Sequence, residues 1–193
     1  MAGHQGAARG ASVSRKAVLL MLAVCAASLA FSQQANVPLG ARLKLHWKGS
    51  TVYVRDGASQ HELAIRNHFH AVVLEKVILQ SAKESGGFVY LLLDVTGPSK
   101  VPADSHQCGA GTESDLIWLK LDQAWKVQDA KDFRYDSCWS TISADDPPKW
   151  EGDTLKVAVF NVRSGGAAVN QVATYTYKHP EEGIKVIETP ADK

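Results

Sequence analysis

Cysteines are the first side chains in this sequence whose type and spacing indicate a chemical role. Outside the N-terminal leader there are two, Cys108 and Cys138. A cysteine pair in an exported chain is typical of a disulfide. This one would close a loop of about 30 residues and stabilise the fold by roughly 3–4 kcal/mol. Zinc sites usually use C-x-x-C pairs with two further ligands, and neither cysteine has such a neighbour. The sequence therefore predicts one structural disulfide.

Two histidines, His68 and His70, are the best candidates for a metal site. Residues two apart on a β-strand share a face, so both imidazoles could reach one zinc or copper ion. Candidates for further ligands on neighbouring strands are His46, His61 and Glu62. Nothing local fixes a third ligand, and paired histidines on a solvated strand are the commoner outcome. The sequence therefore predicts no metal or other cofactor. A small metal-dependent hydrolase that uses the His68/His70 strand face is the alternative function.

Motifs for other catalytic or ligand-binding chemistry are absent or incomplete. There is no G-x-S-x-G nucleophile elbow, and a disulfide would leave no cysteine as a nucleophile. Gly109 and Gly111 fit a phosphate-binding G-x-G-x-x-G, but Ser114 occupies the third position and a strand pattern follows instead of a helix. The acidic residues of a later loop do not match an EF-hand; they are Asp145, Asp146, Glu151 and Asp153. These absences favour a non-enzymatic protein.

A long loop, Thr96–Asp115, separates the apolar segments Gly87–Val95 and Leu116–Leu121. Undivided loops of about 20 residues are uncommon in compact domains unless they are functional or disordered. A disulfide from Cys108 would order this one on a rigid sheet, where binding residues are often placed. The candidate binding residues are Lys100, Asp104, His106, Gln107, Thr112, Glu113 and Trp139. We therefore expect a recognition surface at this loop.

The N-terminus has the three-part pattern of a secretory signal peptide. Arg9, Arg15 and Lys16 precede an apolar run, Ala17–Phe31, and small residues follow at the cleavage spacing. The run is too short for a comfortable membrane span, which needs about 20 apolar residues. Cleavage after residue 32 removes three basic residues and no acidic one, which leaves 18 Lys and Arg against 20 Asp and Glu. We expect a periplasmic or secreted protein that has no membrane span and does not bind nucleic acid, because nucleic-acid binding needs clustered basic residues.

The rest of the chain has the pattern of short β-strands. Arg42–Lys48 and Thr51–Arg55 alternate apolar and polar residues, as half-buried strands do. His70–Ala82 is rich in β-branched residues and predicts a long or broken strand. Gly87–Val95 is apolar on both faces, which is typical of a central strand covered on both sides.

These patterns predict a signal peptide over residues 1–32, an irregular entry segment over 33–41 and one β-rich domain over 42–189. The fold class is mainly β: a single-domain antiparallel β-sandwich or open barrel with one disulfide. The function that the sequence favours is a non-enzymatic extracytoplasmic binding or interaction module. Its partner is a protein or a small molecule that the sequence does not identify.

Overall fold

We analysed a computed structural model of the chain. It describes residues 38–100, 111–140, 142–164 and 167–191. The predicted signal peptide and most of the entry segment lie outside these ranges. No helix in the part of the chain that is described is both long and apolar enough to cross a membrane.

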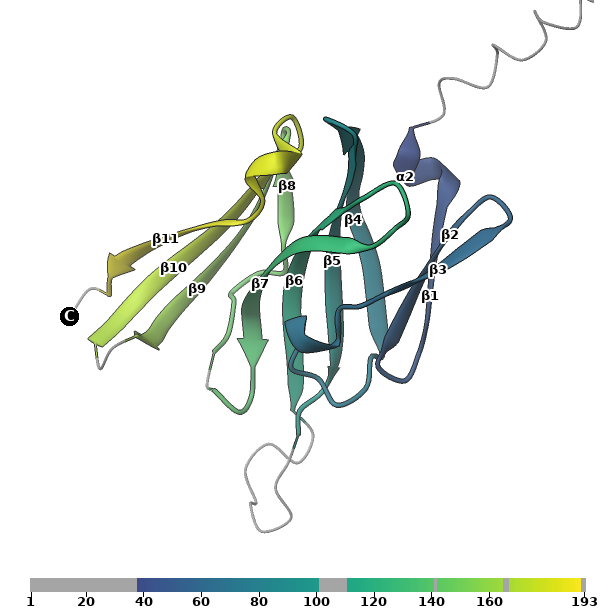
Figure 1. Cartoon of the computed structure of the whole chain (residues 1–193). Helices are drawn as coiled ribbons and strands as arrows, with labels where there is room; N and C mark the ends of the chain where they lie inside the picture. Colours follow the sequence, from purple (N-terminus) through teal and green to yellow (C-terminus); the bar gives the residue numbers. More distant parts are fainter. Residues whose placement is uncertain (1–37, 101–110, 141, 165–166, 192–193) are drawn as a thin grey trace, which may run out of the picture. The chain divides into compact units, whose positions relative to one another are not determined.

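The described residues form three antiparallel sheets (Figure 1). The N-terminal sheet, ordered β1-β2-β3, contains β1 (Leu43–Lys48), β2 (Thr51–Asp56) and β3 (Ser59–Leu63). The central sheet, ordered β4-β5-β6-β7, contains β4 (Lys76–Ser85), β5 (Phe88–Pro98), β6 (Thr112–Leu121) and β7 (Val127–Ser137). The C-terminal sheet, ordered β11-β10-β9-β8, contains β8 (Lys149–Glu151), β9 (Thr154–Ser164), β10 (Ala167–Thr176) and β11 (Lys185–Pro190). The short helices are α2 (Leu39–Arg42), η1 (Arg66–His68) and η2 (Pro180–Glu182).

The central sheet is buried on both faces because its two middle strands are apolar in both alternating sets of residues. On β5, Leu91 and Leu93 pack in one core with residues of the N-terminal sheet. Leu92, between them, packs in a second core with residues of the C-terminal sheet. Its cross-strand partner Trp118 on β6 belongs to the same second core. The prediction of a central strand covered on both sides is confirmed.

The mainly β, antiparallel prediction is also confirmed, and of the two predicted architectures the three sheets fit the β-sandwich. The two separate cores place the central sheet between the other two sheets. The sequence pattern showed that this strand is buried on both faces, but not what covers each face. A strand covered by helices has the same pattern as one covered by sheets, so the number of sheets did not follow from it.

Of the predicted long or broken strand His70–Ala82, only the part from Lys76 onward is strand. β4 begins only at Lys76, and the preceding residues run beside the end of β5. There Val72 N–H donates to the Pro98 carbonyl at 3.0 Å, and Glu75 N–H donates to the Thr96 carbonyl at 2.9 Å. Gly97 permits this close approach, because a Cβ atom at this position would lie 1.9 Å from the Val73 carbonyl oxygen. The segment that carries His70 is therefore held against the end of the central sheet.

Candidate functional site

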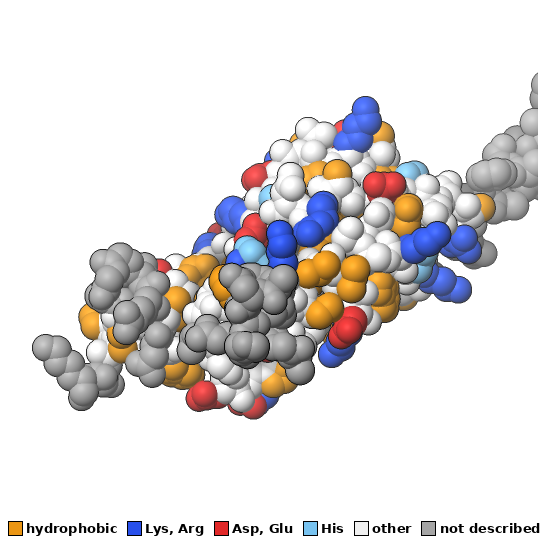
Figure 2. Space-filling model, turned by 90° about the horizontal axis from the view of Figure 1, so that it is seen from below, with side chains coloured by type: hydrophobic (Ala, Val, Ile, Leu, Met, Phe, Trp, Pro, Cys, Tyr) orange, Lys and Arg blue, Asp and Glu red, His pale blue; other side chains and the backbone are white. Residues whose placement is uncertain are grey.

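An open cavity of about 380 Å³ lies at the end of the central sheet where β5 ends and β6 begins. We call it the sheet-end cavity and define it by its lining residues, His70, Lys100, Glu113, Arg134 and Trp139. They come from the segment before β4, the residues after β5, the start of β6, the end of β7 and the turn that follows it. Figure 2 views the molecule from below and shows Lys, Arg and His side chains close to hydrophobic ones on this face.

Asp115 on β6 fixes the position of His70. The Asp115 side chain is 0% exposed. Oδ2 accepts a hydrogen bond from the His70 backbone N–H at 3.0 Å, and Oδ1 lies 2.8 Å from His70 Nδ1. Burial raises the pKa of Asp115, and the hydrogen bonds from His70 and the charge of Arg134 partly oppose that rise. With Nδ1 engaged and the His70 side chain 41% exposed, Nε2 is the ring nitrogen available to the cavity.

Arg134 lies between two buried carboxylates. Its Nε is 3.8 Å from Glu113 Oε2 and 3.8 Å from Asp115 Oδ1. Glu113 is 2% exposed, and its other oxygen accepts a hydrogen bond from Ser99 Oγ at 2.7 Å. Arg134 Nη1 donates to Ser140 Oγ at 2.9 Å, which ties β7 to the turn that carries Trp139. The carboxylates compensate the guanidinium charge, as buried ionised groups require.

Lys100 and Trp139 form the exposed side of the cavity. Trp139 is 52% exposed, the most exposed tryptophan among the described residues. Lys100 is also exposed and immediately follows a buried serine, Ser99. A large aromatic surface left in water beside charged groups is uncommon in a core residue and is typical of a contact site.

On the other face of the central sheet the same end is also polar, but there the polar groups are buried. Tyr135 Oη donates a hydrogen bond to Asp94 Oδ1 at 2.7 Å. Burial is the main cause that raises the pKa of Tyr135, and the Asp94 carboxylate adds to it. Beside this pair, the hydroxyls of Thr96 and Ser114 lie 3.1 Å apart. These groups are buried or half-buried and stabilise the strands rather than line the sheet-end cavity.

The structure brings together three of the predicted binding residues, Lys100, Glu113 and Trp139, in the sheet-end cavity. Thr112 lies elsewhere: its hydroxyl donates to Asp136 at 3.1 Å, and it lines a neighbouring cavity with Cys138. The remaining predicted residues lie outside the described residues; they are Asp104, His106, Gln107 and Cys108.

Sequence reasoning missed Asp115 and Arg134 as parts of this site. A signal for Asp115 was present, because an acidic pair at Glu113 and Asp115 directly precedes the apolar run Leu116–Leu121 with strand spacing. Acidic residues that continue a buried strand face need a partner. Arg134 carried no comparable signal, since basic residues alternate along many strands of this chain.

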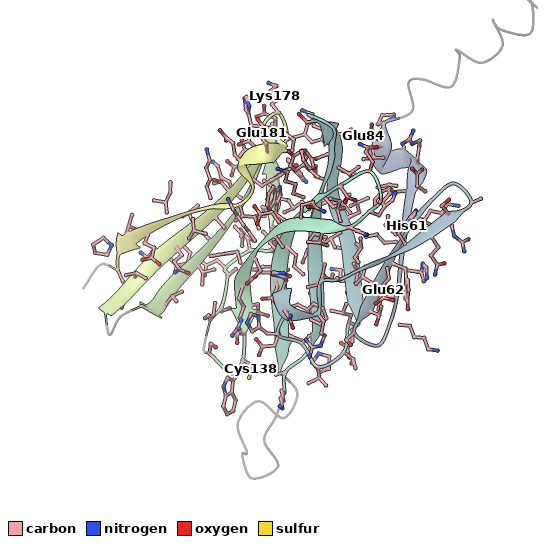
Figure 3. All side chains as sticks on the ribbon, viewed as in Figure 1. His61, Glu62, Glu84, Cys138, Lys178 and Glu181 are labelled. Carbon is pink, nitrogen blue, oxygen red and sulfur yellow. The ribbon has the colours of Figure 1, made fainter. Side chains whose placement is uncertain are left out.

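The histidines do not converge on a metal. The segment around His68 is not a strand: His68 ends η1, and its Nδ1 lies 3.1 Å from Asp132 on β7. His70 instead contacts Asp115. The other proposed ligands lie apart, since His46 stacks on Tyr53 and His61 stacks on Trp125. Figure 3 shows His61 and Glu62 on β3, away from the sheet end where Cys138 lies. Among the described residues, no group of three or more His, Cys, Asp or Glu could hold a metal ion.

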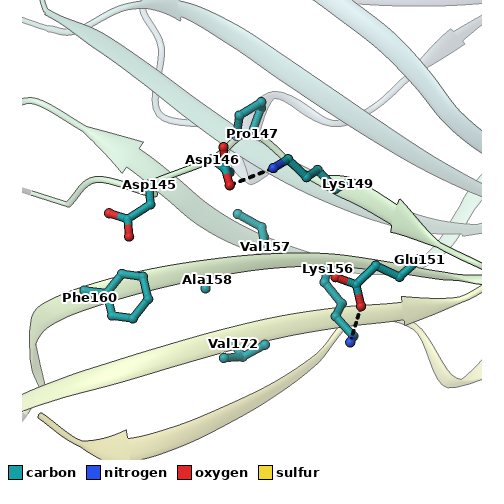
Figure 4. Close-up of a pocket in the computed structure, with 10 residues that line it drawn as sticks. All are labelled: Asp145, Asp146, Pro147, Lys149, Glu151, Lys156, Val157, Ala158, Phe160 and Val172. Atoms are coloured by element: carbon teal, nitrogen blue, oxygen red, sulfur yellow. Dashed lines mark hydrogen bonds and ion pairs between the residues drawn. The ribbon is translucent and has the colours of Figure 1, made fainter.

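A second cavity, of about 290 Å³, lies against the C-terminal sheet (Figure 4). Its lining includes three of the four acidic loop residues that were compared with an EF-hand, Asp145, Asp146 and Glu151. Lys149 Nζ lies 2.7 Å from Asp146, and Lys156 Nζ lies 2.5 Å from Glu151. These pairs are exposed and contribute little to stability. Lysine rather than a shared cation is therefore the partner of both carboxylates.

Cys138 directly follows β7, beside the start of β6. Its backbone N–H donates to the Thr112 carbonyl at 3.2 Å. Thr112 follows Cys108 by four positions in the sequence. Cys138 is therefore hydrogen-bonded to a residue that is four positions from Cys108 in the sequence.

Comparisons of this chain with protein-family models, with curated proteins and with solved structures found no match.

Proposed function

We propose that this protein is an exported, non-enzymatic binding module whose recognition site is the sheet-end cavity. The observation that carries the proposal is the exposed indole of Trp139 beside His70 and Arg134, two basic side chains that buried carboxylates hold in place. Such preorganised groups lose little conformational entropy when a ligand binds. The volume of about 380 Å³ also lies within the usual range for small-ligand sites, about 300–1,000 Å³.

The test uses a double variant, Lys100→Gln with Trp139→Ala, in the mature protein. Both side chains are exposed, so the fold should tolerate their loss. The matched control is Lys149→Gln with Trp150→Ala, a second exposed lysine and tryptophan pair, on β8. Partners captured from a cell-envelope extract should bind the control and not the double variant. Equal capture by both variants would place the binding site elsewhere.

One observation favours the alternative, a small hydrolase. A carboxylate that holds a histidine by Nδ1 leaves Nε2 to take a proton from water or to bind a metal. His70 and Asp115 have this arrangement. Protein purified without a histidine tag should then contain stoichiometric zinc or copper that His70→Ala removes. A metal-free protein would exclude the metal-dependent enzyme.

We further propose that the chain is exported to the periplasm or the medium and that Cys108 and Cys138 form a disulfide there. The leader pattern supports export, and the position of Cys138 beside Thr112 supports the bond. N-terminal sequencing should place the start of the mature protein near Phe31 or Gln33. Non-reducing digestion should give one peptide pair that contains both cysteines. A retained Met1, or alkylation of both thiols without reductant, would refute the respective proposal.

A further inference from the structure

The charges around the sheet-end cavity cancel. Lys100 and Arg134 carry one positive charge each, and the ionised carboxylates of Glu113 and Asp115 carry one negative charge each. The carboxylates are buried and Arg134 is within 4 Å of both. A site whose charges balance in this way has no net charge with which to select an anion or a cation.

The cavity nevertheless offers both hydrogen-bond donors and an acceptor. Lys100 is a donor only, and so is the partly exposed guanidinium of Arg134. With Asp115 ionised, neutral His70 carries its proton on Nδ1, so that Nε2 presents a lone pair. A ligand that fits these groups must itself both accept and donate hydrogen bonds. Hydroxyl groups do both.

Trp139 adds an aromatic face that is left in water. The face of an indole is electron-rich, and it packs well against C–H groups whose hydrogens are slightly positive. A ring with hydroxyls at its edge and C–H groups on its face matches both parts of the site. From this match we infer that the sheet-end cavity binds an uncharged saccharide, an inference that rests on the proposed binding function.

The experiment places the mature protein on an array that carries neutral, uronic-acid and sulfated oligosaccharides. We expect binding to neutral oligosaccharides that is little changed by added salt. Trp139→Ala and Trp139→Leu should each weaken that binding about tenfold or more, whereas Trp139→Phe should keep it within about threefold, because only Phe retains an aromatic face. Trp150→Ala is the control and should bind as the wild type does.

Two results would overturn the inference. One is the absence of binding to any neutral oligosaccharide on the array. The other is binding only to acidic oligosaccharides that salt abolishes, which would assign the site to anions. Neither result decides the proposed binding function, which the capture experiment tests separately. If an envelope partner is captured by the wild type and lost in the Lys100→Gln, Trp139→Ala variant, the binding function stands and only the ligand class is wrong.

Discussion

His70 Nδ1 lies 2.8 Å from Asp115 Oδ1, although 45 positions separate the two residues in the sequence. The same carboxylate accepts a hydrogen bond from the backbone N–H of His70. One buried side chain on β6 therefore fixes both the backbone and the ring of a residue in an irregular segment. This relationship connects the rigid central sheet to the sheet-end cavity.

The first prediction concerns the titration of Asp115. His70→Ala should raise the pKa of Asp115 further, because the His70 side chain lowers it while burial raises it. Carboxyl ¹³C NMR of the labelled protein measures this pKa directly. As a control, Lys178→Met should raise the pKa of Asp153, which Lys178 lowers, and should leave Asp115 unchanged. An Asp115 pKa that is the same with and without His70 would contradict the described contact.

The raised pKa also predicts a pH dependence of stability. Folded protein holds the Asp115 proton more tightly than unfolded protein does. The resulting contribution of Asp115 to the free energy of unfolding is fully present below the ordinary pKa of 3.8. It is lost as the pH rises through the raised pKa. Asp115→Asn does not titrate. As the pH increases from the ordinary pKa through the raised pKa, the free energy of unfolding of this variant should therefore rise relative to that of the wild type. Urea denaturation at several pH values measures both. A difference that does not vary with pH would contradict the expectation.

Gly97→Ala should destabilise the protein by about 2–4 kcal/mol, because the new methyl group has no room. Its Cβ would lie 1.9 Å from the Val73 carbonyl oxygen and 2.9 Å from Ala71 Cβ. The matched control is Gly40→Ala in α2, where the nearest atom lies 3.9 Å away. The control should be unchanged or up to about 1 kcal/mol more stable. Thermal unfolding of both variants compares them, and equal midpoints would refute the described packing.

Trp125 is the one described non-glycine residue with a positive φ, at 63°. It lies in the β6–β7 turn and stacks on His61 with ring centroids 5.3 Å apart. Trp125→Ala should lose the stacking and keep the backbone cost, whereas Trp125→Gly should lose the stacking and remove that cost. We expect the glycine variant to be about 1 kcal/mol more stable than the alanine variant. If alanine is the more stable of the two in urea denaturation, the left-handed conformation of this residue is wrong.

Two buried tyrosine hydroxyls should differ in their contributions to stability. Tyr135 donates to the Asp94 carboxylate, whereas Tyr175 pairs with the neutral hydroxyl of Ser81 at 3.1 Å. Hydrogen bonds to charged groups contribute about 1.5–3 kcal/mol and neutral ones about 0.5–1.5 kcal/mol. Tyr135→Phe should therefore lower the free energy of unfolding more than Tyr175→Phe does. Equal losses would contradict the expected difference between the two hydrogen bonds.

The sequence by itself determined the strands and the doubly buried position of β5. Side chains of a strand alternate between its two faces, so burial of a face leaves a pattern with a period of two in the local sequence. This pattern is visible in the alternation of Thr51–Arg55 and in the apolar run Gly87–Val95. The sequence also pointed to three residues of the cavity: Lys100 and Glu113 through the position of the predicted loop between two apolar strands, and Trp139 through its place next to Cys138.

Only the tertiary structure decided which polar residues meet. His70, Asp115 and Arg134 lie on three separate segments, and their contact depends on the register of β6 with β7 and on the close approach that Gly97 allows. Pattern reasoning placed His68 and His70 on one strand face, where they would share a ligand. Instead, His70 contacts the buried carboxylate of Asp115, and His68 contacts the exposed carboxylate of Asp132. A carboxylate within the sheet needs a nearby partner, and which side chain supplies it depends on how distant segments pack.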